Sequence, residues 1–241
     1  MPVKEHDLQE LRKVLPSSAI LEPSSRDFKS HSTPWSLSYD RSPAIVVVPS
    51  TLEELTLVVK YLYDSDLDFA VRGRGVGSAS ASDVILSLKA FQDVVFDEAS
   101  LTVELGAGLE WGQVDERLIT LAPGYVVVGA RCPFVGVTGS TLTGGLSWLS
   151  HELGLGSDPC NFLDAQIVLA DGRLIWASEE PDLMWALRGG GGNFGGETKT
   201  LTDQYVPFAK LRSCCYSSLT SSQTYVHNLL RHDPLPSRVC S

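Results

Sequence analysis

Ala44-Ile-Val-Val-Val-Pro49 is the run from which the fold can be worked out. It is short, apolar and rich in β-branched residues, which predicts a buried strand. The following residues predict a helix that begins with a capping box, with Ser50 as the N-cap and Glu53 as the third helical residue. A second apolar run, residues 67–71, predicts another strand. Residues 44–72 are therefore expected to form a strand–helix–strand unit.

This unit ends in the glycine-rich segment Arg72-Gly-Arg-Gly-Val-Gly-Ser78. Alternating glycines let a backbone approach a bound group closely and turn its N–H groups toward it. Ser78 adds a hydroxyl donor, and Arg72 or Arg74 could add positive charge. Such a loop suits a pyrophosphate, although a glycine-rich tight turn explains the local sequence equally well. The spacing of the glycines matches neither the dinucleotide fingerprint nor the Walker A pattern.

Beyond this loop the sequence is mostly β-prone, with short apolar runs joined by polar or glycine-containing connections. A helix is expected over residues 112–121, and residues 165–176 predict a hairpin that turns at Asp171-Gly172. Pro181 suits the first turn of a further helix. Short strands mixed with helices predict an α+β fold rather than a doubly wound sheet.

Two more segments, residues 136–145 and 188–195, are rich in glycine. Three such segments within β-rich sequence favour a backbone-lined cleft for an extended ligand over three unrelated turns. The chain carries 29 acidic and 19 basic residues, a net charge of −10, which argues against binding to nucleic acid or to anionic membranes.

The amino terminus has no apolar core of a signal peptide, and no run approaches the ~18 apolar residues of a membrane helix. These features predict a cytoplasmic protein. The five cysteines lack the spacing of metal ligands, so no metal site is expected.

Several segments together resemble the FAD-binding domain of flavin-dependent oxidoreductases of the vanillyl-alcohol-oxidase and berberine-bridge-enzyme type. The match lies in the order and spacing of the motifs, each of which is weak alone. The matching segments are residues 43–54, 72–78, 135–145, 170–172, 182–190 and 193–195.

The resemblance implies a PCMH-type FAD-binding domain of two α+β subdomains over residues 40–196. Residues 1–39 are expected to form an N-terminal helix and an extended arm. Residues 197–241 are expected to be an atypical tail, which can be disordered, because an apolar strand would be expected after Gly195 and the sequence is polar. The substrate domain that follows in the family is missing, and with it the residues that would choose the substrate or act as catalytic base. No catalytic residue is therefore assigned.

The resemblance also implies cofactor contacts. Residues 72–78 would hold the pyrophosphate mainly through backbone N–H groups, residues 136–145 would line the pyrophosphate, ribityl and isoalloxazine stretch, and Val168 would present its backbone near the adenine. The expected FAD contacts are Arg72, Gly73, Arg74, Gly75, Val76, Gly77, Ser78, Cys132, Gly136, Thr138, Gly139, Ser140, Gly144, Gly145 and Val168.

Two positions bear on covalent attachment. Val76 stands where the family commonly has a histidine linked to the flavin, and its isopropyl group cannot form that bond. Cys132 lines up with the cysteine of bicovalent members, and Arg131 beside it would favour a thiolate. The alternative for Cys132 is a small buried thiol near the ring. Noncovalent FAD is expected, with a cysteinyl link as the other reading.

Four more polar residues could serve a catalytic site, but structural roles are the preferred interpretation for each. His151 could be an acid–base residue, although a partly exposed helical histidine is the preferred interpretation. The carboxylates of Asp158, Asp164 and Asp171 have turn-like neighbours and are expected to stabilise turns.

The resemblance implies an FAD-dependent oxidoreductase that transfers hydride from a small organic substrate to flavin N5, with molecular oxygen as the second substrate. The alternative is a catalytically inactive FAD-binding fragment, or a subunit that depends on a partner and can self-associate through uncovered apolar surface. A third reading is a sugar- or nucleotide-binding module without flavin.

Overall fold

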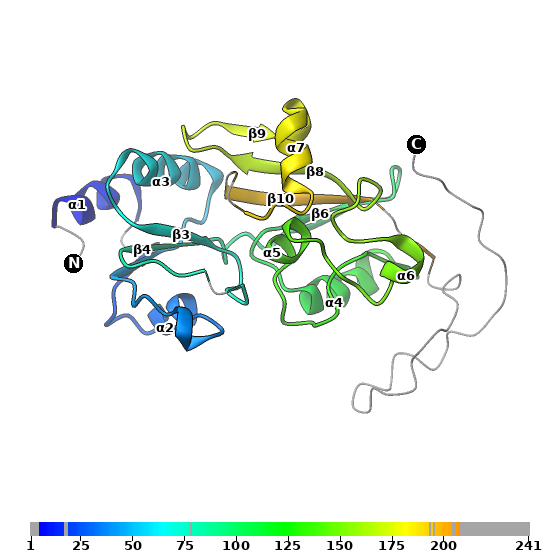
Figure 1. Ribbon diagram of the computed structural model, residues 1–241, viewed down its shortest axis with the longest axis horizontal. Coiled ribbons are helices and arrows are strands. Elements are labelled where there is room, and N and C mark those ends of the chain that lie inside the picture. The colour runs from blue at the N-terminus through cyan, green and yellow to red at the C-terminus, as the bar shows by residue number, and fades with distance from the viewer. Residues whose placement is uncertain are drawn as a thin grey trace.

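The computed structural model describes residues 5–16, 19–77, 79–192, 194, 196–203 and 206–207. The described chain forms two lobes side by side, each built on its own sheet (Figure 1). This mixture of helices and strands in two subdomains confirms the predicted α+β class. Within the described residues, no helix is long and apolar enough to span a membrane.

The first lobe contains a four-stranded sheet with helices on both faces (Figure 1). Its elements are α1 (Glu5–Val14), β1 (Ile20–Leu21), α2 (Phe28–Ser32), η2 (Leu37–Tyr39), β2 (Ile45–Val47), α3 (Leu52–Asp64), β3 (Phe69–Arg72) and β4 (Val84–Ser87). The strand order is β1-β2-β4-β3, and β4 runs parallel to both β2 and β3. The strand–helix–strand unit is present as predicted, but β4 lies between its two strands.

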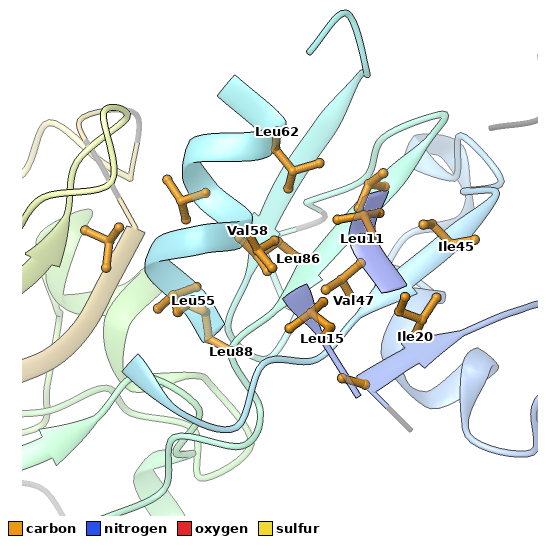
Figure 2. Packing of buried hydrophobic residues seen from close by; sticks show 14 of the residues in the cluster. Leu11, Leu15, Ile20, Ile45, Val47, Leu55, Val58, Leu62, Leu86 and Leu88 are labelled. Carbon is orange, nitrogen blue, oxygen red and sulfur yellow. The ribbon is translucent and has the colours of Figure 1, made fainter. Parts of the chain in front are cut away.

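Alternation along these short strands divides the core of the first lobe into two layers. Figure 2 shows Leu11 of α1 and Leu55 of α3 converging on Val47 and Leu86, with all four fully buried. On the opposite face, Phe28 of α2 packs in a separate cluster with the neighbouring strand residues Val46 and Ile85. Because successive side chains of a strand point to opposite faces, a three-residue strand can supply both layers.

The capping box of α3 lies one residue later than predicted. The N-cap is Thr51, whose hydroxyl accepts from the Glu54 N–H at 3.1 Å. The Glu54 carboxylate in turn accepts from the N–H and the hydroxyl of Ser50, at 2.7 and 2.9 Å. Ser50 with Glu53 and Thr51 with Glu54 both fit the sequence pattern. The local pattern therefore could not fix the first helical residue.

The arm predicted over the first 39 residues is only partly extended. Residues 28–32 form α2 and residues 20–21 pair with β2 as strand β1, so this segment covers one face and one edge of the first sheet. The N-terminal helix is present as α1. The serines and prolines of this segment predict no helix. Burial of Phe28 against the sheet accounts for the helix that forms there.

The second lobe is built on an antiparallel sheet with the order β5-β6-β10-β8-β9. Helix α4, the hairpin and the helix that begins at Pro181 all follow the sequence predictions. The elements are β5 (Val94–Asp97), β6 (Thr102–Gly106), α4 (Trp111–Leu121), β7 (Tyr125–Val126), α5 (Val137–Leu142), α6 (Ser150–Leu153), β8 (Phe162–Val168), β9 (Leu174–Trp176), η3 (Ala177–Glu179), α7 (Pro181–Leu187), β10 (Gly196–Asp203) and β11 (Val206–Pro207).

Strand β10 is the main departure from the predicted boundaries. Residues 197–203, which the sequence assigns to the tail, lie in the centre of the second sheet, and β10 joins β6 to β8 (Figure 1). Residues 206–207 pair with β7 as β11. The sequence of β10 has one large apolar residue, Leu201, among polar residues and glycine, so it gave no strand signal. Residues 208–241 lie outside the described residues.

Candidate cofactor-binding site

The three glycine-rich segments, far apart in the sequence, come together at the junction of the two lobes. A Cβ atom at Gly136 would lie 3.0 Å from Cγ of Arg74, so the first two segments are in contact. The N–H of Gly191 donates to the carbonyl of Leu142 at 2.8 Å, which ties the third segment to the second. The three segments therefore adjoin one another in the fold, while a shared ligand site remains a prediction.

The first segment turns sharply at Gly75, where φ is +81°. Within the described residues, the N–H groups of residues 74–77 donate no hydrogen bond. Unpaired N–H groups that follow a strand in a tight loop are the donors an anionic group requires. Ser78 lies outside the described residues.

The two arginines of this loop are engaged within the protein. Arg72 is 6% exposed, and its guanidinium donates to the carbonyls of Ser32 and Thr33 at 2.9 and 2.5 Å. Burial, reinforced by the charge of Arg74, lowers the pKa of Arg72. Arg74 forms an ion pair with Glu110, with Nε 2.7 Å from Oε1. The positive charge of the two arginines would attract an anionic ligand in the loop, but the hydrogen bonds of both guanidinium groups described above go to the protein itself.

The second segment offers backbone rather than side chains. Ser140 Oγ accepts from the indole N–H of Trp111 at 2.7 Å and donates to the carbonyl of Gly136 at 2.7 Å. The hydroxyl of Thr138 donates to the carbonyl of Ala107 at 3.3 Å. The hydroxyls of Thr138 and Ser140, which were predicted to contact the cofactor, thus both donate to carbonyls of the protein. Within the described residues, the N–H groups of Thr138 and Gly139 donate no hydrogen bond.

Gly139 faces open space, with no described atom within 4 Å of where its Cβ would lie. Gly145, in contrast, is closely packed: φ is +69°, and a Cβ there would lie 2.9 Å from Cα of Gly156. Two backbone bonds fix this approach, from Gly156 N–H to Gly145 O at 2.8 Å and from Ser157 N–H to Gly144 O at 3.0 Å. The segment therefore combines a rigid base with an open backbone surface, as a bound planar or extended group would need.

The remaining predicted FAD contacts are Cys132, Val76 and Val168. Cys132 is an exposed free thiol, so the interpretation of a buried thiol was wrong. It lies in a surface turn, where Arg131 places its guanidinium carbon 5.7 Å from the centre of the Trp148 ring. Val76 is half-buried in the glycine loop. Val168 is buried in the core of the first lobe, and its strand is paired on both edges, so its side chain is not available to a ligand.

Three of the four polar residues that were expected to have structural roles have them as predicted, and Asp164 is the exception. His151 is exposed on α6. Asp158 accepts from the N–H of Leu155 and Asp171 from that of Arg173, at 2.8 and 3.0 Å, as turn-forming carboxylates do. Asp164 is instead a strand residue of β8, and its carboxylate bonds the N–H and hydroxyl of Ser178.

Two groups of residues near the site were not predicted from the sequence. Ser30, His31, Ser87 and Lys89 line a small cavity beside Arg72–Arg74. Trp35 stacks on Phe134 with ring centres 5.2 Å apart and planes at 3°. These residues come from separate elements, and no local spacing connects them.

The fold and these loops have counterparts in known proteins. The model of a family described as FAD binding domain matches residues 43–178. An FAD-dependent monooxygenase, prx3 of Penicillium roqueforti, is 32% identical over 198 residues, which are 79% of this chain and 38% of that protein. The (R)-6-hydroxynicotine oxidase of Paenarthrobacter nicotinovorans is 28% identical over 192 residues, 77% of this chain and 41% of that protein.

Solved structures agree on the fold. A variant of berberine bridge enzyme in complex with (S)-reticuline superposes with a TM-score of 0.76 at 22% identity, and the match covers 86% of this chain and 44% of that one. 6-Hydroxy-D-nicotine oxidase from Arthrobacter nicotinovorans gives 0.70 at 27%, covering 77% of this chain and 42% of its own. The chain thus spans about two fifths of the length of the relatives it matches.

Proposed function

Because this chain belongs to the FAD-binding domain family, we propose that it forms the cofactor-binding portion of an FAD-dependent oxidoreductase. The observation that carries the proposal is the meeting of three glycine-rich segments. In two of them, the N–H groups of residues 74–77, 138 and 139 donate no bond to described residues. A diphosphate needs several such donors, and an open glycine surface admits a ring or ribityl chain without clash.

When bound, the flavin would supply hydride acceptance at N5 and reoxidation by molecular oxygen, with a small organic molecule as the reductant. This chain would bind and orient the flavin through backbone N–H groups. The catalytic base and the substrate contacts are proposed to lie in the part of the relatives' length that has no counterpart here. The relatives include proteins described as monooxygenase and as 6-hydroxynicotine oxidase, so the chemistry of the substrate is left open.

Attachment of the flavin is proposed to be noncovalent, since Val76 offers no nucleophile in the glycine loop. The exposed thiol of Cys132 is the alternative link. The purified chain is expected to show a flavin visible spectrum that dithionite bleaches. Acid precipitation should release the yellow colour to the supernatant. Colour retained in the pellet, and lost in Cys132→Ser, would establish a cysteinyl link; a protein that stays colourless with added FAD would contradict the proposal.

A second candidate is an FAD-binding fragment without activity that pairs with another copy or another chain. It is favoured by exposed large side chains beside the site, since Trp35 is 68% and Trp148 53% exposed. Apolar surface of this kind favours association in water. Light scattering tests it: a monomer that turns over substrate would exclude this candidate.

Gly139→Ala separates cofactor binding from folding. An alanine methyl meets no described atom here, and alanine is about 1 kcal/mol better than glycine inside a helix. The variant is therefore expected to unfold at the same or a slightly higher urea concentration. If FAD packs against this surface, its Kd should rise about tenfold, equivalent to about 1.4 kcal/mol. Unchanged affinity in a stable variant would place the cofactor away from Gly139.

A further inference from the structure

Asn161 is a buried polar residue with no part in the function proposed above. It lies directly before β8 and is 1% exposed. Its carboxamide nitrogen donates to the carbonyl of Leu153 at 2.8 Å and to that of Leu155 at 2.7 Å. Two carbonyl acceptors use both hydrogens of the amide, so these bonds fix the orientation of the carboxamide.

The oxygen of the same carboxamide is buried and has no hydrogen-bond partner among the described residues. Such an acceptor is unfavourable, and most buried polar groups in folded proteins have a partner. The bonds made by the nitrogen must outweigh this loss. The backbone of residues 153–155 is therefore the feature that Asn161 fixes.

The carbonyls that Asn161 binds belong to the turn that contacts the second glycine-rich segment. Gly156 follows Leu155 directly, and its N–H donates to the carbonyl of Gly145 at 2.8 Å. A Cβ atom at Gly145 would lie 2.9 Å from Cα of Gly156, so a small shift of the turn would alter this contact. Asn161 thus binds the residue next to the closest backbone approach of the candidate site.

Neighbouring residues hold the same turn and connect it to the third glycine-rich segment. The Asp158 carboxylate accepts from the N–H of Leu155 at 2.8 Å, and its carbonyl accepts from the N–H of Asn161 at 2.8 Å. The carbonyl of Phe162 accepts from Nη2 of Arg188 at 2.9 Å. The chain at residues 161–162 therefore joins the second segment to the third.

We propose that Asn161 is a positioning residue of the cofactor site, which holds the turn of residues 153–157 so that Gly156 supports Gly145. This inference rests on the proposed function. Asn161 itself makes no bond to the cofactor, because its carboxamide is buried and both of its donors are used. A ligand-binding backbone keeps its geometry only if the residues behind it are fixed, and loose support weakens binding.

Asn161→Ala removes both donors. FAD titration of the folded variant is expected to give a Kd raised about tenfold, equivalent to about 1.4 kcal/mol. Leu62→Ala is the control for a general loss of stability, since Leu62 is 1% exposed in the core of the first lobe (Figure 2). It should lower the urea midpoint and leave the Kd of the folded protein unchanged.

Asp158 provides a second pair of variants, which test the same turn without changing Asn161. Asp158→Ala removes the acceptor for the N–H of Leu155, so it should also raise the Kd for FAD. Asp158→Asn keeps an oxygen that can accept this bond and should restore tight binding. These variants decide the question if Asn161→Ala does not fold.

A double-mutant cycle distinguishes positioning from a general structural role. If Asn161 acts through the contact of Gly145 with Gly156, the losses of FAD affinity in Asn161→Ala and Gly145→Ala will not multiply, because the contact can be lost only once. Gly139→Ala is the control partner, since no described atom lies within 4 Å of its added Cβ. Its loss should multiply with that of Asn161→Ala.

The inference is overturned if folded Asn161→Ala binds FAD as tightly as the unsubstituted chain, or if its loss multiplies with that of Gly145→Ala. Unchanged affinity in Asp158→Ala would overturn it where Asn161→Ala does not fold. A chain that binds no FAD would reject the proposed function. The same cycle in the free energy of unfolding then decides about Asn161: non-additive losses support its hold on the contact, and additive losses overturn it.

Discussion

A chain that ends at Phe194 is expected to lose both its second sheet and its affinity for FAD, whereas one that ends at Pro207 keeps both. The shorter chain lacks β10, which pairs with β6 along one edge and β8 along the other. Strands β6 and β8 do not pair with each other in the sheet order β5-β6-β10-β8-β9. Without β10, the two halves of the sheet therefore have no ladder between them.

The size of the effect follows from the ladders. Five residues of β10 face β6 and six face β8, and an antiparallel ladder has about one hydrogen bond per facing pair. At about 1 kcal/mol net for each bond, the loss is on the order of 10 kcal/mol. That is comparable to the roughly 5–15 kcal/mol that stabilises a whole domain.

Far-UV circular dichroism, urea unfolding and FAD titration of the two chains measure this difference. The chain that ends at Pro207 retains β10 and β11 and is the matched control. Equal unfolding midpoints for the two chains would mean that β10 is dispensable. The ladders on its two edges would then contribute little to the stability of the second lobe.

The first lobe was largely predictable because its short strands are continuous apolar runs. Val47 and Leu86 reach the layer of α3, and Val46 and Ile85 reach that of α2, so nearly every position had to be apolar. The N-cap of α3 was missed by one residue, since two overlapping sequences fit the same capping pattern. Helix α2 was missed because a single buried aromatic, Phe28, anchors it.

The candidate site was predictable as backbone but not as side chains. Glycine marks where a chain turns or approaches another group, so three glycine-rich segments predicted a shared site. Arg72 and Ser140 were expected to face a ligand, yet their polar atoms bond the protein itself. Lys89 and His31 gave no signal, because the cavity they line is assembled from separate elements.

Gly145→Ala is expected to destabilise the fold and to weaken FAD binding together. Alanine in the left-handed region costs roughly 1–2 kcal/mol, and φ at this position is +69°. The added methyl would also lie 2.9 Å from the backbone of Gly156, and overpacking of this kind costs roughly 1–3 kcal/mol. The two effects together predict a loss of roughly 2–5 kcal/mol in the free energy of unfolding.

Gly124→Ala separates these two contributions. Its φ is +86°, and no described atom lies within 4 Å of the added Cβ, so only the backbone strain applies. Urea unfolding should give about 1–2 kcal/mol for this control and a larger value for Gly145→Ala. The difference between the variants then measures the close approach of Gly145 to Gly156.

FAD titration tests whether the close approach of Gly145 to Gly156 supports the cofactor site. Gly156 and Ser157 donate to the carbonyls of Gly145 and Gly144, so displacing either backbone would move the end of the glycine segment that is proposed to lie under the flavin. Gly145→Ala should therefore bind FAD more weakly even under conditions where it is fully folded, while Gly124→Ala should bind it normally. Equal losses of stability in the two variants would mean that the backbone yields at little cost. The contact between Gly145 and Gly156 would then not form a rigid base for the cofactor site.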